Sequence, residues 1–92
     1  MENKKQPVTV KGDFRTIVIF IVDDQEILRV RYKRKVPVIP AVSTTVAILE
    51  SRRPRVEVIY TVNKVVYDYR GLDSFSQEMW VYIYLKKRTE LH

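Results

Sequence analysis

Hydrophobic residues along the chain recur at every second position or in short continuous runs, which is the pattern of β-strands. The longest continuous run extends from Ile17 to Val22, inside a strand predicted over residues 14–22. Because this run has no polar face, it predicts either a central strand covered on both sides or a strand with one side waiting for another subunit. Apolar positions at helical spacing are not sustained anywhere along the chain, so we expect strands throughout.

Two further segments have opposed polar and apolar faces. After a polar hairpin turn at residues 23–26, residues 27–36 alternate and predict a half-buried strand that ends before Pro37 and Pro40. Its outer face carries a basic ladder made of Arg29, Arg31, Lys33 and Lys35. Residues 79–86 alternate in the same way and predict a strand with Met79, Val81, Ile83 and Leu85 turned inward. Its other face carries an aromatic stripe made of Trp80, Tyr82 and Tyr84.

The middle of the chain predicts a short strand over residues 44–49, a basic connection over residues 50–55 and a long extended segment over residues 56–69. In the long segment the apolar phase reverses between Val62 and Val65. A reversal of phase predicts a bulge or a bend at Asn63-Lys64. Residues 70–78 are expected to form a loop that could contain a single helical turn.

Together these segments predict an all-β fold, a small and strongly bent antiparallel barrel or sandwich of five to six strands. Closure of the barrel would remove the exposed strand edges. At 92 residues the chain has room for one hydrophobic core. We expect residues 1–7 to form a flexible N-terminal arm, residues 8–88 a single β-barrel domain and residues 89–92 a frayed C-terminus.

The order of these features resembles that of small SH3-like β-barrel proteins, in which two long strands and a Pro-x-x-Pro entry precede a short strand and a bent pair. The residues that carry the resemblance are Pro37 to Val42, Thr45 to Ile48, Val62 to Tyr67 and Val81 to Leu85. Many such barrels have a glycine soon after the second proline, where this chain has Ser43. The resemblance implies a barrel that binds peptides, proteins or nucleic acids, and it assigns no site residues.

Composition excludes several kinds of chemistry. The chain has no cysteine, so it has no disulfide, thiolate nucleophile or Cys-ligated metal. The apolar run at residues 17–22 is too short to span a bilayer and too deep in the chain for a signal peptide, so we expect an intracellular protein.

The sequence predicts a protein that is not an enzyme and has no catalytic, cofactor or metal site. The sole histidine, His92, is the last residue and is a poor candidate for a general base. Gly12 and Gly71 are the only glycines, too few for a phosphate-binding loop. Asp23-Asp24 and the Asp68 and Asp73 pair are more simply explained by turns and loops than by catalysis. No small-molecule substrate is evident.

The basic ladder is the first candidate binding feature. With Arg52, Arg53 and Arg55 it could follow a phosphate backbone, and the formal net charge of +6 agrees with an anionic partner. The alternative is an ordinary solvated strand face whose charges protect a sheet edge from aggregation.

The aromatic stripe is the second candidate feature, and it would continue onto Tyr67 and Tyr69 if the last two strands pair in that way. Its simplest interpretation is that cross-strand aromatic pairs stabilise the sheet. Contact with a protein comes next, since Tyr and Trp bury a large area and keep a polar end. Stacking of nucleic-acid bases is the third interpretation.

Two functional hypotheses follow. The first is a non-enzymatic protein-interaction or self-assembling module, based on the apolar run at residues 17–22 and on the Trp80 stripe. The second is a nucleic-acid binder that uses the basic ladder for phosphates and the aromatic stripe for bases. Neither hypothesis involves a membrane. A structure separates them, because basic and aromatic residues on one face favour nucleic acid, whereas opposite faces favour protein contact.

Overall fold

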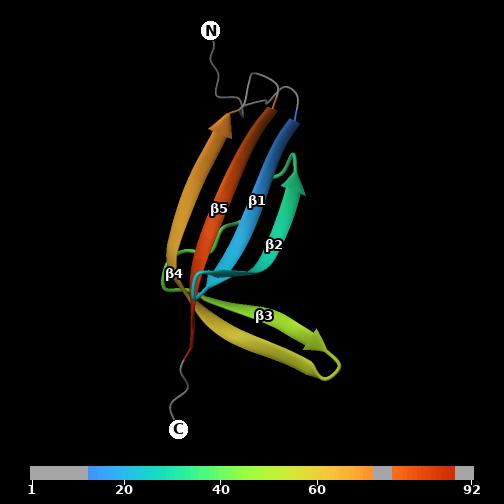
Figure 1. Cartoon of the computed structure of the whole chain (residues 1–92), viewed down its shortest axis with the longest axis vertical. Coiled ribbons are helices and arrows are strands. Elements are labelled where there is room, and N and C mark those ends of the chain that lie inside the picture. The colour runs from blue at the N-terminus through green and yellow to red at the C-terminus, as the bar shows by residue number, and fades with distance from the viewer. Residues whose placement is uncertain (1–12, 72–75, 89–92) are drawn as a thin grey trace.

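The computed structural model describes residues 13–71 and 76–88, which form five β-strands in a single sheet (Figure 1). The expected N-terminal arm and C-terminal end lie outside the described residues. Among the described residues, no helix has the length and apolar character needed to cross a membrane. The strands are β1 (Asp13–Val22), β2 (Gln25–Lys33), β3 (Thr45–Arg52), β4 (Arg55–Gly71) and β5 (Ser76–Lys87).

The strands follow the order β2-β1-β5-β4-β3 and curl strongly into a half-barrel (Figure 1). This confirms the predicted all-β, strongly bent, SH3-like fold with five strands. One pair departs from the expected antiparallel arrangement, because β1 and β5 are parallel and the sheet is therefore mixed. Among the described strands β3 contacts only β4, so the half-barrel is open between β2 and β3.

β4 is the strand that bends the sheet. Its first part pairs with β3 and its second part with β5, and the register shifts between Val62 and Lys64. The bulge predicted at Asn63-Lys64 is confirmed. It explains the reversal of apolar phase, since one extra residue turns each following side chain to the other face.

The turns explain where β1 ends and β2 begins and ends. Asp23 and Asp24 have φ angles of 51° and 63°, which is the geometry of a two-residue hairpin turn that Asp tolerates. β2 ends at Lys33 because Arg34 takes a left-handed φ of 59°. The predicted strand over residues 27–36 is therefore too long at this end, and Lys35 leaves the basic ladder. The Lys35 carbonyl instead accepts a hydrogen bond of 3.0 Å from the hydroxyl of buried Thr16.

The turn before β3 forms without a glycine. Ser43 takes a φ of 78°, the conformation that glycine adopts most easily. Its backbone N–H donates to the Val62 carbonyl at 2.8 Å, and the Thr44 hydroxyl donates to the Ala41 carbonyl at 2.6 Å. These bonds hold the start of β3 against β4.

Three predicted boundaries move outward in the structure. β3 continues beyond residue 49 to Arg52, and β4 continues beyond residue 69 to Gly71. β5 begins at Ser76 rather than at residue 79. The loop expected over residues 70–78 is therefore shortened to residues 72–75, and the helical turn considered there lies outside the described residues.

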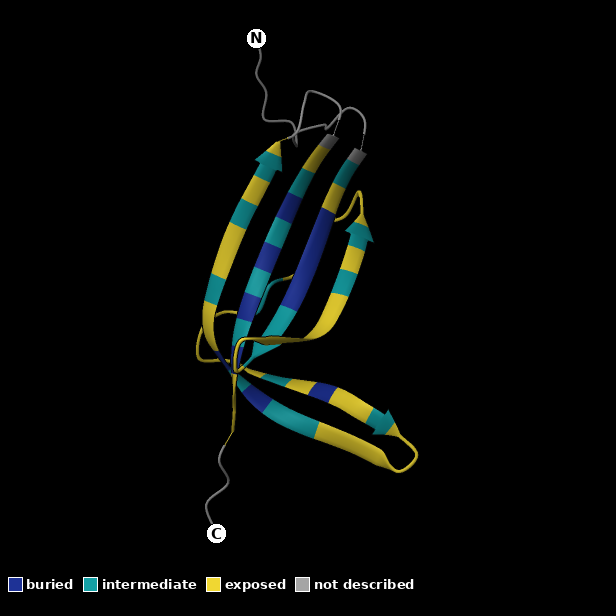
Figure 2. Cartoon of the chain, in the orientation of Figure 1, coloured by how far each residue is buried: buried dark blue, intermediate teal, exposed yellow. Residues whose placement is uncertain are grey.

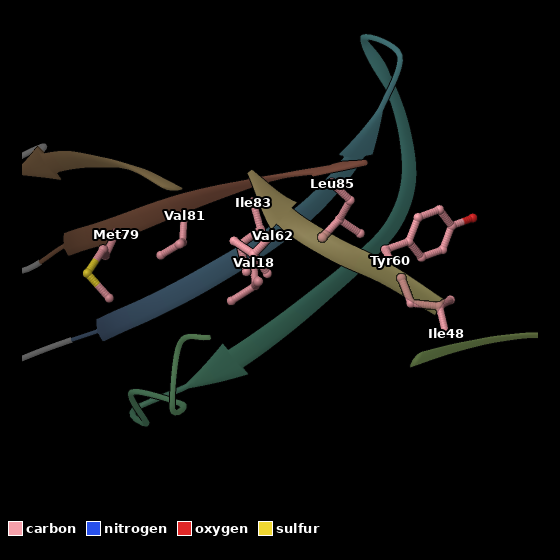
Figure 3. Packing of buried hydrophobic residues seen from close by; sticks show 8 residues of the cluster. All are labelled: Val18, Ile48, Tyr60, Val62, Met79, Val81, Ile83 and Leu85. Atoms are coloured by element: carbon pink, nitrogen blue, oxygen red, sulfur yellow. The ribbon is translucent and has the colours of Figure 1, made fainter. Parts of the chain in front are cut away.

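The hydrophobic core lies on the concave side of the sheet (Figure 3). Burial alternates along β5 as predicted, with the four inward residues between 0% and 6% exposed (Figure 2). Partly buried side chains of β1, β2 and β3 pack around this cluster. The buried members of the cluster are Val18, Ile48, Tyr60, Val62, Met79, Val81, Ile83 and Leu85.

Tyr60 links the core to the surface and makes a pH-dependent contribution to stability. Burial and a 2.9 Å hydrogen bond to Glu50 raise its pKa above the usual value. Because the folded state keeps the phenol neutral after the unfolded chain ionises, this contribution is complete below pH 10 and declines as the pH rises further. We expect Tyr60→Phe to lower the free energy of unfolding by about 1 kcal/mol at pH 7. Urea unfolding at pH 7 and above pH 10 tests this, and a difference between the two proteins that stays constant with pH would contradict it.

Candidate functional site

The register of the sheet places the basic ladder and the aromatic stripe on the same face. Ile17 pairs with Arg31 on one side and with Trp80 on the other, and Ile19 pairs likewise with Arg29 and Tyr82. Side chains of directly paired residues project from the same face of a sheet. This convex surface, called the mixed face below, comprises Arg15, Ile17, Ile19, Arg29, Arg31, Lys33, Lys64, Asp68, Arg70, Glu78, Trp80, Tyr82 and Tyr84.

The apolar run of β1 is covered on both sides within the chain. Ile17 and Ile19 point to the mixed face but are only 5% and 3% exposed, while Val18 points to the core. Long side chains from β2 and β5 therefore cover the middle of β1. Of the two alternatives raised by the sequence, the structure supports the covered central strand.

Trp80 is the centre of the mixed face. The Arg70 guanidinium carbon lies 4.2 Å from the centroid of the indole ring, and that of Arg29 lies 5.6 Å from it. Both distances are within the range of cation–π attraction. The indole N–H donates to Glu78 at 2.9 Å, and the Tyr82 ring stacks beside the indole at a centroid distance of 6.3 Å. The stripe and the cations thus form one connected cluster.

Carboxylates on the same surface hold the two guanidinium groups in place. Arg29 donates two hydrogen bonds to Glu26, at 2.8 Å and 3.0 Å, and Arg70 donates to Asp68 at 2.9 Å and to the Tyr82 hydroxyl at 3.1 Å. The hydrogen bond to Glu26 raises the pKa of Arg29, and the bond to Asp68 raises that of Arg70. Both groups are therefore fixed cations.

The remaining cations extend the cluster in both directions. The Lys64 ammonium lies 4.8 Å from the centroid of the Tyr84 ring, at the end of the mixed face near the bulge. Arg31 and Lys33 have no ion-pair partner among the described residues. The mixed face therefore carries six cationic side chains against two carboxylates, or three when Glu26 is included.

A depression of about 330 Å³ lies between β2 and β5 on the mixed face. Ile17 and Trp80 supply apolar lining, and the cations surround it. Its size is at the lower end of small-ligand pockets, so it can hold part of an extended polymer. The charged residues that line it are Arg15, Arg29, Arg31, Lys33 and Glu78.

No family model, curated protein or solved structure matches the chain. The functional argument therefore depends on the geometry of the mixed face. Among the described residues, no three His, Asp or Glu side chains gather closely enough to hold a metal ion.

The structure separates some predicted site residues from the mixed face. Arg52, Arg53 and Arg55 lie at the tip of the β3–β4 hairpin, which projects away from the rest of the sheet (Figure 1), and Arg55 pairs with Glu57 at 2.8 Å. They do not continue the basic ladder.

Tyr67 and Tyr69 lie on the opposite face from the aromatic stripe. They pair with buried Val81 and Met79, so they point to the concave side, where they are 49% and 74% exposed. The expectation that they continue the stripe is wrong, because it required them to pair with the outward residues of β5.

Sequence analysis missed Arg15, Lys64 and Arg70 as parts of this surface. A signal for two of them exists in β4, where Lys64, Asp68 and Arg70 alternate with the inward residues that follow the bulge. Arg15 has the same phase as Ile17 in β1. Their common location depends on the strand order, which the sequence pattern does not contain.

Proposed function

We propose that the protein is a non-enzymatic binder of single-stranded nucleic acid and that the mixed face is its binding surface. The observation that supports this function best is the shared face of the basic ladder and the aromatic stripe. Proteins that bind single strands with little sequence preference combine a cationic track with aromatic platforms in the same way. Cations alone would attract any anion, and aromatics alone would favour a protein partner.

Phosphates would contact the β2 side of the mixed face. Arg31 and Lys33 carry charges that no ion pair among the described residues neutralises, and both belong to an edge strand of the sheet. A phosphate that binds there exchanges counterions for protein cations, which makes binding depend on salt.

Bases would lie over the β5 side, where both the aromatic rings and the guanidinium planes offer flat surfaces. Bases stack on aromatic side chains and equally on arginine planes. Arg29 and Arg70 are held beside the Trp80 ring by their carboxylate partners, so little side-chain freedom remains to be lost on binding. The depression beside Trp80 gives one base or sugar room to enter.

A protein-interaction module is the second candidate function. One of its two bases in the sequence has weakened, because the apolar run of β1 is already covered within the chain. The observation that favours it is the unpaired edge of β3. Such a role can coexist with nucleic-acid binding, since β3 lies outside the mixed face.

Titration of a labelled single-stranded oligonucleotide of mixed sequence tests the proposed function. We expect the logarithm of the affinity to fall with the logarithm of the salt concentration with a slope of about −2, as three phosphate contacts predict. Trp80 is the only tryptophan, so stacking of bases should change the intrinsic fluorescence as well.

Inorganic polyphosphate is the matched control for this titration, because it carries the charge without the bases. It should bind with a similar salt dependence and leave the tryptophan signal almost unchanged. Absence of binding at 50 mM salt would overturn the proposal. Equal affinity and an equal fluorescence change with polyphosphate would remove the role of the aromatic stripe.

A further inference from the structure

β3 presents a free edge at the opening of the half-barrel. It pairs with β4 on one side only, and among the described strands it contacts no other. A cleft of about 590 Å³ lies between this edge and the first two strands. Phe20, Leu28 and Val30 line one wall of the cleft, and Val46 and Ile48 line the other.

The hydrogen-bond pattern shows which backbone groups of β3 are free. The Val62 N–H donates to the Thr44 carbonyl at 2.9 Å, and the pairing continues in this register through Val46 and Ile48. Because such bonds alternate along an antiparallel pair, Thr45, Ala47 and Leu49 direct their N–H and C=O groups away from β4. All three residues are exposed, Leu49 to 38%.

The two edges of the sheet differ in how they are protected. The β2 edge carries Arg29, Arg31 and Lys33, so pairing of two β2 edges would place like charges opposite each other. The β3 edge is uncharged from Thr45 to Leu49 and contains no proline. A neutral, apolar edge of this kind is a template for pairing with another strand.

We infer that a second copy of this chain docks on the β3 edge, antiparallel and with a two-fold axis at Ala47. This pairing joins Ala47 to Ala47 of the partner subunit and exchanges two hydrogen bonds between them. Val46 and Ile48 of each copy then face the cleft of the other and cover Leu28, which is 38% exposed. The inference is independent of nucleic-acid binding, because it uses none of the residues of the mixed face.

The mass in solution tests the pairing directly. We expect the full chain to have twice the mass of one chain in sedimentation or light scattering at concentrations of tens of micromolar. Ala47→Lys places two ammonium groups opposite each other and should weaken the dimer at least tenfold. Val38→Lys is the matched control, because Val38 is 96% exposed in the loop between β2 and β3, and this variant should remain dimeric.

Cross-linking provides a second test that does not depend on weakening the dimer. The chain has no cysteine, so Ala47→Cys carries a single thiol. A hydrogen-bonded antiparallel pair has Cα atoms about 5.5 Å apart, which suits a disulfide. We expect Ala47→Cys to form a covalent dimer rapidly on oxidation and Val38→Cys to form it at least tenfold more slowly.

Three outcomes would overturn the inference. A wild-type chain that stays monomeric at several hundred micromolar has no such interface. An Ala47→Lys variant that folds and remains dimeric associates through another surface. A mass that grows continuously with concentration indicates head-to-tail pairing of β3 with β2 of the next copy in place of a closed pair.

Discussion

Simultaneous replacement of Arg29, Arg31 and Lys33 with glutamate is expected to lower the affinity for single-stranded oligonucleotides at least about 100-fold at 50 mM salt. Three attractive contacts become repulsive on the β2 side of the mixed face. The salt dependence should collapse as well, because the slope falls by about 0.7 for each lost phosphate contact on a single strand. Anisotropy titrations at three salt concentrations measure both quantities.

The matched control for this variant changes Arg52, Arg53 and Arg55 to glutamate. It makes the same change in net charge on the hairpin tip, away from the mixed face. We expect a loss of affinity below about fivefold, from the general field of the protein alone. If the two triple variants lost affinity equally, net charge would explain the binding and the assignment of the mixed face would be wrong.

Ile83→Ala is expected to cause the largest loss of stability among single truncations of the core. Ile83 is 0% exposed at the centre of the sheet, between Phe20 of β1 and Val65 of β4. Strands on both sides prevent the backbone from closing the cavity, so the free energy of unfolding should fall by about 3 to 5 kcal/mol. For a domain of this size, each kilocalorie corresponds to a decrease in Tm of about 4 to 8 °C. Thermal and urea unfolding measure the change.

Val56→Ala serves as the comparison for this truncation. Val56 is also a β-branched residue in a strand, but it is 39% exposed near the start of β4. We expect a loss of less than about 1 kcal/mol. A similar loss for the two variants would show that Ile83 does not occupy the centre of the core.

Local features of the fold could be predicted from sequence because they depend on neighbouring residues. Alternation along β5 identified its inward residues, and the reversal of phase in β4 located the bulge near Asn63. The polar pair Asp23-Asp24 identified the hairpin turn. Each of these signals is contained in a few consecutive positions, where side-chain direction alone decides the pattern.

Features that depend on which strands are neighbours could not be predicted in the same way. The parallel pairing of β1 with β5 brings Ile17 beside Trp80, and no local pattern contains this contact. The faces of Tyr67 and Tyr69 depend on the register between β4 and β5. The end of β2 depends on the backbone conformation of Arg34, a residue type that gives no turn signal. The composition of the mixed face is a result of all three dimensions of the fold.

The parallel pair at the centre of the sheet also has a consequence for how the chain folds. β1–β2 and β3–β4 are hairpins that close through short turns, so they can form early and separately. β5 must be synthesised before β1 gains its second neighbour, and that pairing closes a loop over most of the domain. High contact order of this kind slows folding. Until β5 arrives, Ile17 and Ile19 lack the cover that Trp80 and Tyr82 provide, so the nascent chain exposes its most apolar strand for the longest time.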